Sequence, residues 1–134
     1  MTIRARNRTI AGGVIIGVIA LAVSLLPMLA SPAENPVREV RLVVRGMTFY
    51  VDGQTDPNPA ITLRAGEHVR ITVRNEDAGM HHDFAIKAWS IATRMLDDRG
   101  QTTAVTFRVP DEKGTQTYFC TPHSATMQGT LRIE

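Results

Sequence analysis

Three side chains near the C-terminus, those of Cys120, His123 and Met127, could together hold a metal ion. They offer a thiolate, an imidazole and a thioether within one short stretch, and this set of ligands favours copper over calcium, magnesium or manganese. Two histidines and one cysteine around copper, with a weakly bound methionine, form the geometry of blue-copper electron-transfer sites. The stretch supplies one histidine, so a second must come from elsewhere in the chain.

The remaining histidines are His68, His81 and His82. If the residues before Phe84 lead into a strand, His82 shares a face with Phe84 and Ile86, because side chains alternate along a strand. Since those two apolar residues belong in a core, His82 is expected to point inward and His81 outward. His68 falls on the polar face of its own predicted strand and is expected to be a solvated surface histidine. We therefore predict His82 as the second ligand, with His81 as the next candidate.

The elements that must position these side chains are predicted to be short strands. Between residues 67 and 75, apolar and polar residues alternate, which is typical of a strand with one buried face. The same alternation recurs over 101–109. Further strands are expected at 37–45, 60–63, 115–120 and 129–133. Segment 88–100 fits either a short helix or a packed loop. Many short strands separated by turn signals indicate an all-β sandwich or barrel.

The N-terminal region differs from the rest in composition. Residues 10–30 carry no charge, and a helix of that length would span roughly 31 Å, close to the thickness of the hydrocarbon core of a membrane. The basic residues 1–9 are expected to stay in the cytoplasm, with 31–36 as a linker and 37–134 as an exported domain. A cleaved signal peptide is the alternative, since Ser31-Pro32-Ala33 is an acceptable cleavage site. The apolar run is longer than a signal peptide needs, so we favour an uncleaved membrane anchor.

The distribution of charge argues against nucleic-acid binding. The chain has 15 basic and 13 acidic residues, but Arg4, Arg6 and Arg8 lie in the N-terminal tail. The rest of the chain therefore holds 12 basic against 13 acidic residues. Binding to phosphate needs clustered lysines and arginines on the folded part of a protein, so we expect no nucleic-acid partner.

At these residues the chain resembles the cupredoxins, the plastocyanin/azurin family of blue copper proteins. The resemblance covers roughly residues 37–134. It rests on four stretches: Ile61 to Glu67 with Val69, Asn75-Glu76-Asp77, His82-Asp83-Phe84, and Cys120-x-x-His123 with Met127 and Gly129. The loop after Cys120 is most similar to those of amicyanin and pseudoazurin. The resemblance implies a Greek-key β-sandwich with one copper ion at one end, and its matching ligand positions are His82, Cys120, His123 and Met127.

Two features depart from the usual pattern of the family. The spacing from His123 to Met127 lies between those of amicyanin and plastocyanin, which leaves the length of the axial bond open. Asp83 stands where many members carry asparagine, a side chain that usually ties the loop of the first histidine to the loop of the cysteine. A carboxylate could accept the same backbone hydrogen bonds, and we expect Asp83 and the neighbouring Thr121 to belong to the hydrogen bonds around the ligands, where they tune the metal. An ionised Asp83 is expected to stabilise Cu(II) and lower the reduction potential.

The leading hypothesis is a carrier of single electrons, cycling one copper ion between Cu(I) and Cu(II) outside the cytoplasmic membrane. The alternative is a protein that binds, delivers or stores copper without transferring electrons. An enzyme is not expected, because four histidines and one cysteine cannot build a second, multinuclear copper centre beside this site. The expected partners are unidentified redox proteins, respiratory by inference from location and family, and the expected state is a monomer.

Overall fold

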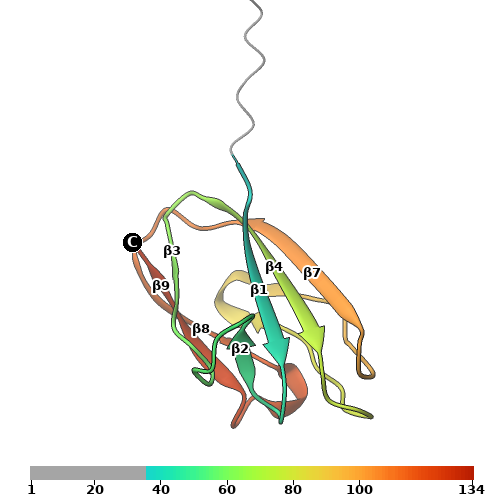
Figure 1. Cartoon of the computed structure of the whole chain (residues 1–134). Coiled ribbons are helices and arrows are strands. Elements are labelled where there is room, and N and C mark those ends of the chain that lie inside the picture. The colour runs from blue at the N-terminus through green and yellow to red at the C-terminus, as the bar shows by residue number, and fades with distance from the viewer. Residues whose placement is uncertain (1–35) are drawn as a thin grey trace, which may run out of the picture. The chain divides into compact units, whose positions relative to one another are not determined.

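The computed structural model describes residues 36–134, which form two β-sheets (Figure 1). The predicted tail 1–9, the apolar segment 10–30 and all but the last residue of the linker 31–36 lie outside the described residues. Within 36–134, no helix has the length and apolar character needed to cross a membrane. The all-β prediction is confirmed. The elements are β1 (Arg38–Val44), β2 (Phe49–Val51), β3 (Ile61–Leu63), β4 (His68–Asn75), β5 (Ala85–Ile86), η2 (Lys87–Trp89), β6 (Ile91–Ala92), β7 (Thr102–Arg108), β8 (Gly114–Phe119), η3 (Thr121–His123) and β9 (Gln128–Ile133).

The first sheet has the strand order β2-β1-β4-β7. Strand β4 pairs in parallel with β1 and antiparallel with β7, so its backbone is hydrogen-bonded on both edges. Its side chains alternate as the sequence predicts: Val69, Ile71 and Val73 are fully buried, whereas Arg70 and Arg74 are exposed. This central strand ends at Asn75, where the chain enters the loop that leads to His82.

The second sheet has the order β3-β9-β8-β5-β6. Strands β8 and β9 form an antiparallel hairpin whose register runs from Gly114 opposite Ile133 to Phe119 opposite Gln128. The connection between these strands is the stretch 120–127, which contains three of the predicted ligands. Strand β5 joins the other edge of β8 through Ala85 opposite Phe119. This pairing brings the segment that follows His82 alongside the strand that precedes Cys120.

The core between the sheets contains a cluster of aromatic rings close to the ligand loop. Tyr118 stacks on Phe84 with ring centroids 5.3 Å apart, and Phe49 meets Tyr118 edge-on at 5.4 Å. All three side chains are fully buried. Burial of a side chain such as Phe49 or Phe84 contributes about 1.5–3 kcal/mol, so this cluster gives the residues at the end of β8 a rigid support.

Segment 88–100 is mostly irregular. It contains the end of η2, the two-residue strand β6, and a single bridge between Leu96 and His82. Trp89 is half-buried and packs against Phe107 with ring centroids 5.8 Å apart. Strands β2 and β6, of three and two residues, were not predicted. Strand β3, also of three residues, lies within the strand predicted at 60–63.

Candidate metal centre

The loop between β8 and β9 is closed by its own backbone hydrogen bonds. The N–H of His123 donates to the carbonyl of Cys120 at 3.1 Å, and the N–H of Met127 donates to the carbonyl of His123 at 2.9 Å. The N–H of Cys120 in turn donates to the carbonyl of Met127 at 3.0 Å. Pro122 lies within η3, where its fixed φ favours a tight turn. The loop therefore returns Met127 to the side of Cys120, and both side chains are fully buried.

His82 enters the same region from a different part of the chain. Its N–H donates to the carbonyl of Leu96 at 2.9 Å, and the N–H of Leu96 donates back to the carbonyl of His82 at 2.7 Å. This bridge fixes the backbone at His82, and the side chain is fully buried. His81 points outward, and its Nδ1 lies 3.1 Å from the exposed Asp97. The inward and outward directions predicted from alternation are those seen in the structure.

His82, Cys120 and His123 converge on one point. The Sγ atom of Cys120 lies 3.6 Å from Nδ1 of His82 and 3.6 Å from Nδ1 of His123. One ligand atom from each of the three residues lies within 4.8 Å of the others. One thiolate and two imidazole nitrogens facing a common centre match the donor set that suits copper, so the residues present fit this metal.

Burial controls the protonation of the side chains at this centre. It raises the pKa of Cys120 to about 11, above its ordinary value of 9.0. Burial also lowers the pKa of His82, although the charge of Asp77 partly opposes this effect. His82 is therefore a neutral imidazole at pH 7, whereas Cys120 is a neutral thiol. A thiol must lose its proton to become a metal ligand, so metal binding releases a proton from Cys120.

Asp83 connects the two loops, as the family resemblance implies. Its Oδ1 accepts the N–H of Thr121 at 2.6 Å, and its Oδ2 lies 2.6 Å from the hydroxyl of the same residue. The Asp83 side chain is almost fully buried. This pair of short hydrogen bonds holds the residue after Cys120 against the residue after His82.

Two residues near the centre were missed by the sequence analysis. Asp77 lies 3.2 Å from Nε2 of His82. Asn58 accepts the N–H of Phe49 at 3.1 Å and donates to the carbonyl of Thr126 at 3.3 Å, so it ties the ligand loop to β2. Asp77 belongs to the stretch Asn75-Glu76-Asp77 that carries the family resemblance, but neither Asp77 nor Asn58 was assigned a role from the sequence.

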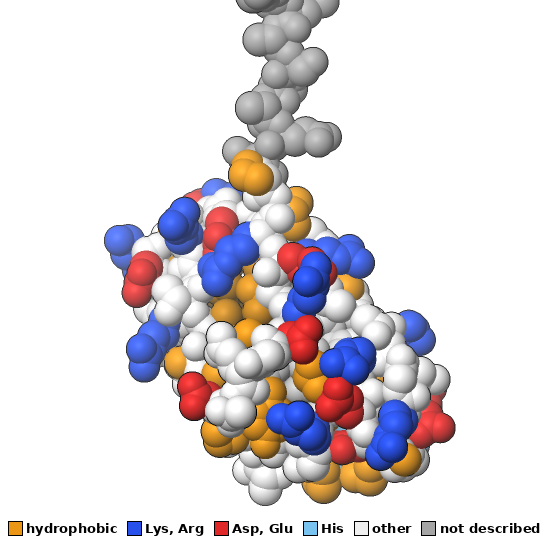
Figure 2. Space-filling view, viewed as in Figure 1, with side chains coloured by type: hydrophobic (Ala, Val, Ile, Leu, Met, Phe, Trp, Pro, Cys, Tyr) orange, Lys and Arg blue, Asp and Glu red, His pale blue; other side chains and the backbone are white. Residues whose placement is uncertain are grey.

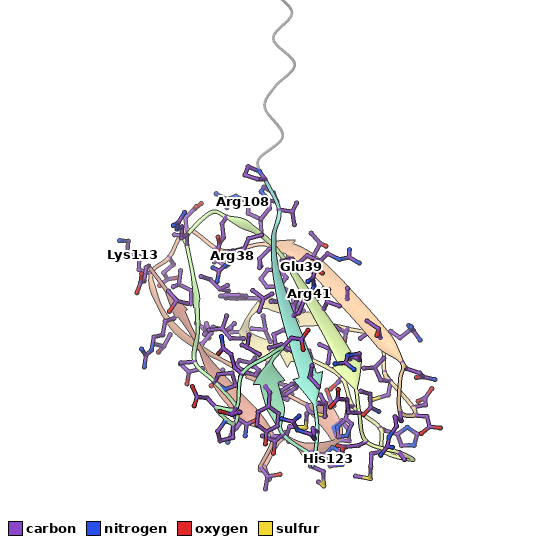
Figure 3. All side chains as sticks on the ribbon, in the orientation of Figure 1. Arg38, Glu39, Arg41, Arg108, Lys113 and His123 are labelled. Atoms are coloured by element: carbon purple, nitrogen blue, oxygen red, sulfur yellow. The ribbon has the colours of Figure 1, made fainter. Side chains whose placement is uncertain are left out.

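His68 differs from its prediction and lies away from the centre. It is half-buried, and its Nδ1 atom is buried with no hydrogen-bond partner in the structure, so the prediction of a solvated surface histidine is wrong. His68 lies at the start of β4, opposite Arg108 of β7. Figure 3 places Arg108 at the end of the domain remote from His123.

His123 is the ligand candidate nearest to solvent. It is half-buried, whereas His82 is fully buried, and it lies at the end of the domain opposite the start of β1 (Figure 3). On the face shown in Figure 2, basic and acidic side chains are interspersed. Ion pairs of the domain include Arg41–Glu39 at 2.7 Å and Arg74–Glu76 at 2.8 Å. This face has no broad surface of one charge.

Comparisons with known proteins support the chemistry of this centre. The family model of copper-binding proteins of the plastocyanin/azurin family matches residues 57–134. Among solved structures, auracyanin B is 26% identical, with a TM-score of 0.59 over 75% of this chain and 91% of that chain. No curated protein sequence matches the chain.

Two further solved structures are similar in fold. Auracyanin A, a "blue" copper protein from the green thermophilic photosynthetic bacterium Chloroflexus aurantiacus, is 21% identical, with a TM-score of 0.59 over 74% of this chain and 100% of that one. Rusticyanin from Thiobacillus ferrooxidans is 19% identical, with a TM-score of 0.56 over 75% of this chain and 79% of that one.

Proposed function

The chain belongs to the plastocyanin/azurin family of copper-binding proteins, and on that premise we propose that it carries single electrons outside the cytoplasmic membrane. Copper is its cofactor. The proposed ligands are His82, Cys120, His123 and Met127. The observation that carries the proposal is the convergence of one sulfur and two imidazole nitrogens, with Cys120 Sγ 3.6 Å from each Nδ1.

The proposed ligands differ in their access to solvent, and this difference suits electron transfer. Copper, when bound, supplies the chemistry by alternating between Cu(I) and Cu(II). His82, Cys120 and Met127 are fully buried, so they keep water and bulky substrates away from the centre. His123 is half-buried and provides the shortest route between the centre and a partner protein.

The hydrogen bonds around the ligands favour a centre that changes little in shape. Residues 120–127 are closed by their own backbone hydrogen bonds. Asp83 fastens Thr121, and Leu96 fastens His82. Ligands held in this way need little rearrangement when the charge of the site changes, which is what a carrier requires. A copper-delivery protein would instead need ligands that release the metal readily.

The proposed location depends on the sequence of the N-terminal region. Residues 10–30 are uncharged and follow a basic tail, so we propose that they anchor the chain in the membrane or direct its export before cleavage, with the domain 37–134 outside. The start of β1 lies at the end of the domain opposite His123 (Figure 3). We propose a monomer with no enzymatic activity of its own.

The visible absorption spectrum of the purified full chain, loaded with Cu(II), tests this function. We expect an intense thiolate-to-copper band that bleaches with a mild reductant and returns on oxidation. His82→Asn should abolish the band, whereas the matched control His81→Asn, at an exposed position, should retain it. Bound copper without the band would refute the electron carrier and favour delivery or storage. A chain that binds no copper would refute the ligand assignment.

A further inference from the structure

The carboxylate of Asp77 lies behind the buried histidine of the metal centre. Its Oδ2 is 3.2 Å from Nε2 of His82, on the side of the ring away from Cys120. The same carboxylate accepts the N–H of Gly46 at 2.7 Å through Oδ1 and the N–H of Met47 at 3.0 Å through Oδ2. Asp77 therefore links His82 to the turn between β1 and β2.

The position of Asp77 is itself fixed by the end of strand β4. Its N–H donates to Oδ1 of Asn75 at 2.8 Å. The amide of Asn75 is fully buried and also donates to the carbonyl of Met80 at 2.9 Å. The loop from Asn75 to His82 is thus held at both ends, and the Asp77 side chain is mostly shielded from solvent.

The chemistry of a carboxylate determines which proton His82 carries. An ionised carboxylate only accepts hydrogen bonds, so a bond with Asp77 requires a hydrogen on Nε2. The other ring nitrogen, Nδ1, then has a free lone pair, and this atom faces Cys120 Sγ. Histidines that bind metals usually donate their second N–H to such an oxygen, which fixes the tautomer and the ring orientation.

We propose that Asp77 is a positioning residue that holds His82 in its Nε2–H tautomer and so presents Nδ1 to copper. This inference rests on the proposed function for the metal, but the tautomer belongs to the polypeptide itself. The geometry carries the assignment: Oδ2 of Asp77 faces Nε2 of His82 at 3.2 Å, and Nδ1 of the same ring faces Cys120 Sγ at 3.6 Å.

A merely structural role for Asp77 must be separated from this proposal. Gly46 and Met47 both have positive φ, 58° and 56°, and a non-glycine residue with such a φ is uncommon. The hydrogen bonds from their N–H groups to Asp77 stabilise this turn. Truncating Asp77 would therefore lower the stability of the domain whether or not it positions His82.

The experiment uses nitrogen-15 NMR of the histidine rings in the full chain without metal, at neutral pH. In the parent we expect the Nε2–H tautomer at His82. Asp77→Ala should shift the ring toward Nδ1–H, whereas Asp77→Asn should restore the parent tautomer at least in part, because its amide oxygen can still accept a hydrogen bond. Asp98→Ala is the matched control, because Asp98 accepts N–H groups of Gly79 and Arg99 on neighbouring turns and should leave His82 unchanged.

A second measurement on the same variants is copper affinity, determined by competition with a chelator. We expect Asp77→Ala to weaken copper binding about 10–100-fold, the usual effect of losing such a partner, and Asp98→Ala to have no comparable effect. An Nδ1–H tautomer in the parent would overturn the inference, even if the variants failed to fold. Equal tautomers and affinities in the Asp77→Ala and Asp98→Ala variants would also overturn it. A parent that binds no copper would instead refute the proposed function.

Discussion

Replacing Gly129 with alanine tests how closely the hairpin that carries the ligands is packed. Gly129 lies opposite Tyr118 in the β8–β9 pair. A Cβ atom on Gly129 would lie 2.3 Å from both Cζ and the hydroxyl oxygen of Tyr118. Gly129 is not among the residues with positive φ, so alanine brings no backbone strain of its own. The substitution therefore isolates a collision between two side chains.

The size of the effect follows from what surrounds the Tyr118 ring. Nonbonded carbon atoms pack at about 3.5–4.0 Å, so the ring or strand β9 must move by about 1 Å. The ring is stacked on Phe84, and its hydroxyl donates to the carbonyl of Pro59 at 2.7 Å. Overpacking costs about 1–3 kcal/mol, and loss of a buried hydrogen bond costs about 1–3 kcal/mol. We expect Gly129→Ala to lower the free energy of unfolding by about 2–6 kcal/mol.

Denaturant titration of the full chain without metal, followed by the fluorescence of Trp89, measures this loss. Thr130→Ala, at the adjacent exposed position, is the control and should change stability by less than about 0.5 kcal/mol. Combining Gly129→Ala with Tyr118→Phe should cost less than the sum of the two, because the residues are in contact. A Gly129→Ala chain as stable as the Thr130→Ala chain would refute the packing argument.

Three further predictions concern the residues at the metal centre. Asp83→Asn should raise the reduction potential measured by voltammetry, because a negative charge near the site is removed; an unchanged or lower potential would contradict this. The same substitution should lower the free energy of unfolding by about 1 kcal/mol, because its hydrogen bonds are weaker. Cys120 in the metal-free folded chain should react with iodoacetamide at pH 8 about 100-fold more slowly than in the denatured chain. Burial raises the pKa of Cys120 to about 11, which reduces the fraction of thiolate to about 0.001 at this pH. Equal reaction rates in the folded and denatured chains, measured by mass spectrometry, would contradict the prediction. Burial lowers the pKa of His82 in the folded state below 6.5. As the pH falls, the His82 imidazole is therefore protonated in the unfolded chain before it is protonated in the folded chain. The contribution of His82 to the free energy of unfolding of the metal-free chain should be complete above pH 6.5. It should be lost as the pH falls, by up to about 1.4 kcal/mol per pH unit. If His82→Asn left the dependence of this free energy on pH unchanged, the assignment to His82 would be wrong.

The long strands could be predicted from the sequence because their period is visible. In β4 the alternation of valine and isoleucine with arginine places one face in the core, and the structure has this arrangement. The inward direction of His82 follows from the same reasoning, applied to its apolar neighbours. These inferences succeed because alternation over several residues reflects burial of one face of a sheet.

The shortest elements and the supporting side chains could not be predicted. Strand β6 has two residues and is defined by its pairing with β5, which no local pattern reveals. Asp77 is one of several acidic residues in turns. Its contact with Gly46 and Met47 joins positions 31 and 30 residues apart. The predicted role of Asp83 came from the family resemblance, in which this position usually carries asparagine. The resemblance also covers Asp77 but implied no role for it.

The arrangement of the centre depends on contacts between segments that are distant in sequence. Asp83 reaches Thr121 across 38 residues, Asn58 reaches Thr126 across 68, and Asp77 joins the β1–β2 turn to His82. Each of these side chains lies outside the stretch 120–129, although that stretch contains three of the four proposed ligands. A transplant of this stretch into another hairpin would therefore carry the thiolate, one imidazole and the thioether, but not the contacts that orient them. The geometry of the site is consequently a property of the whole domain, not of the loop that gives it its recognisable sequence.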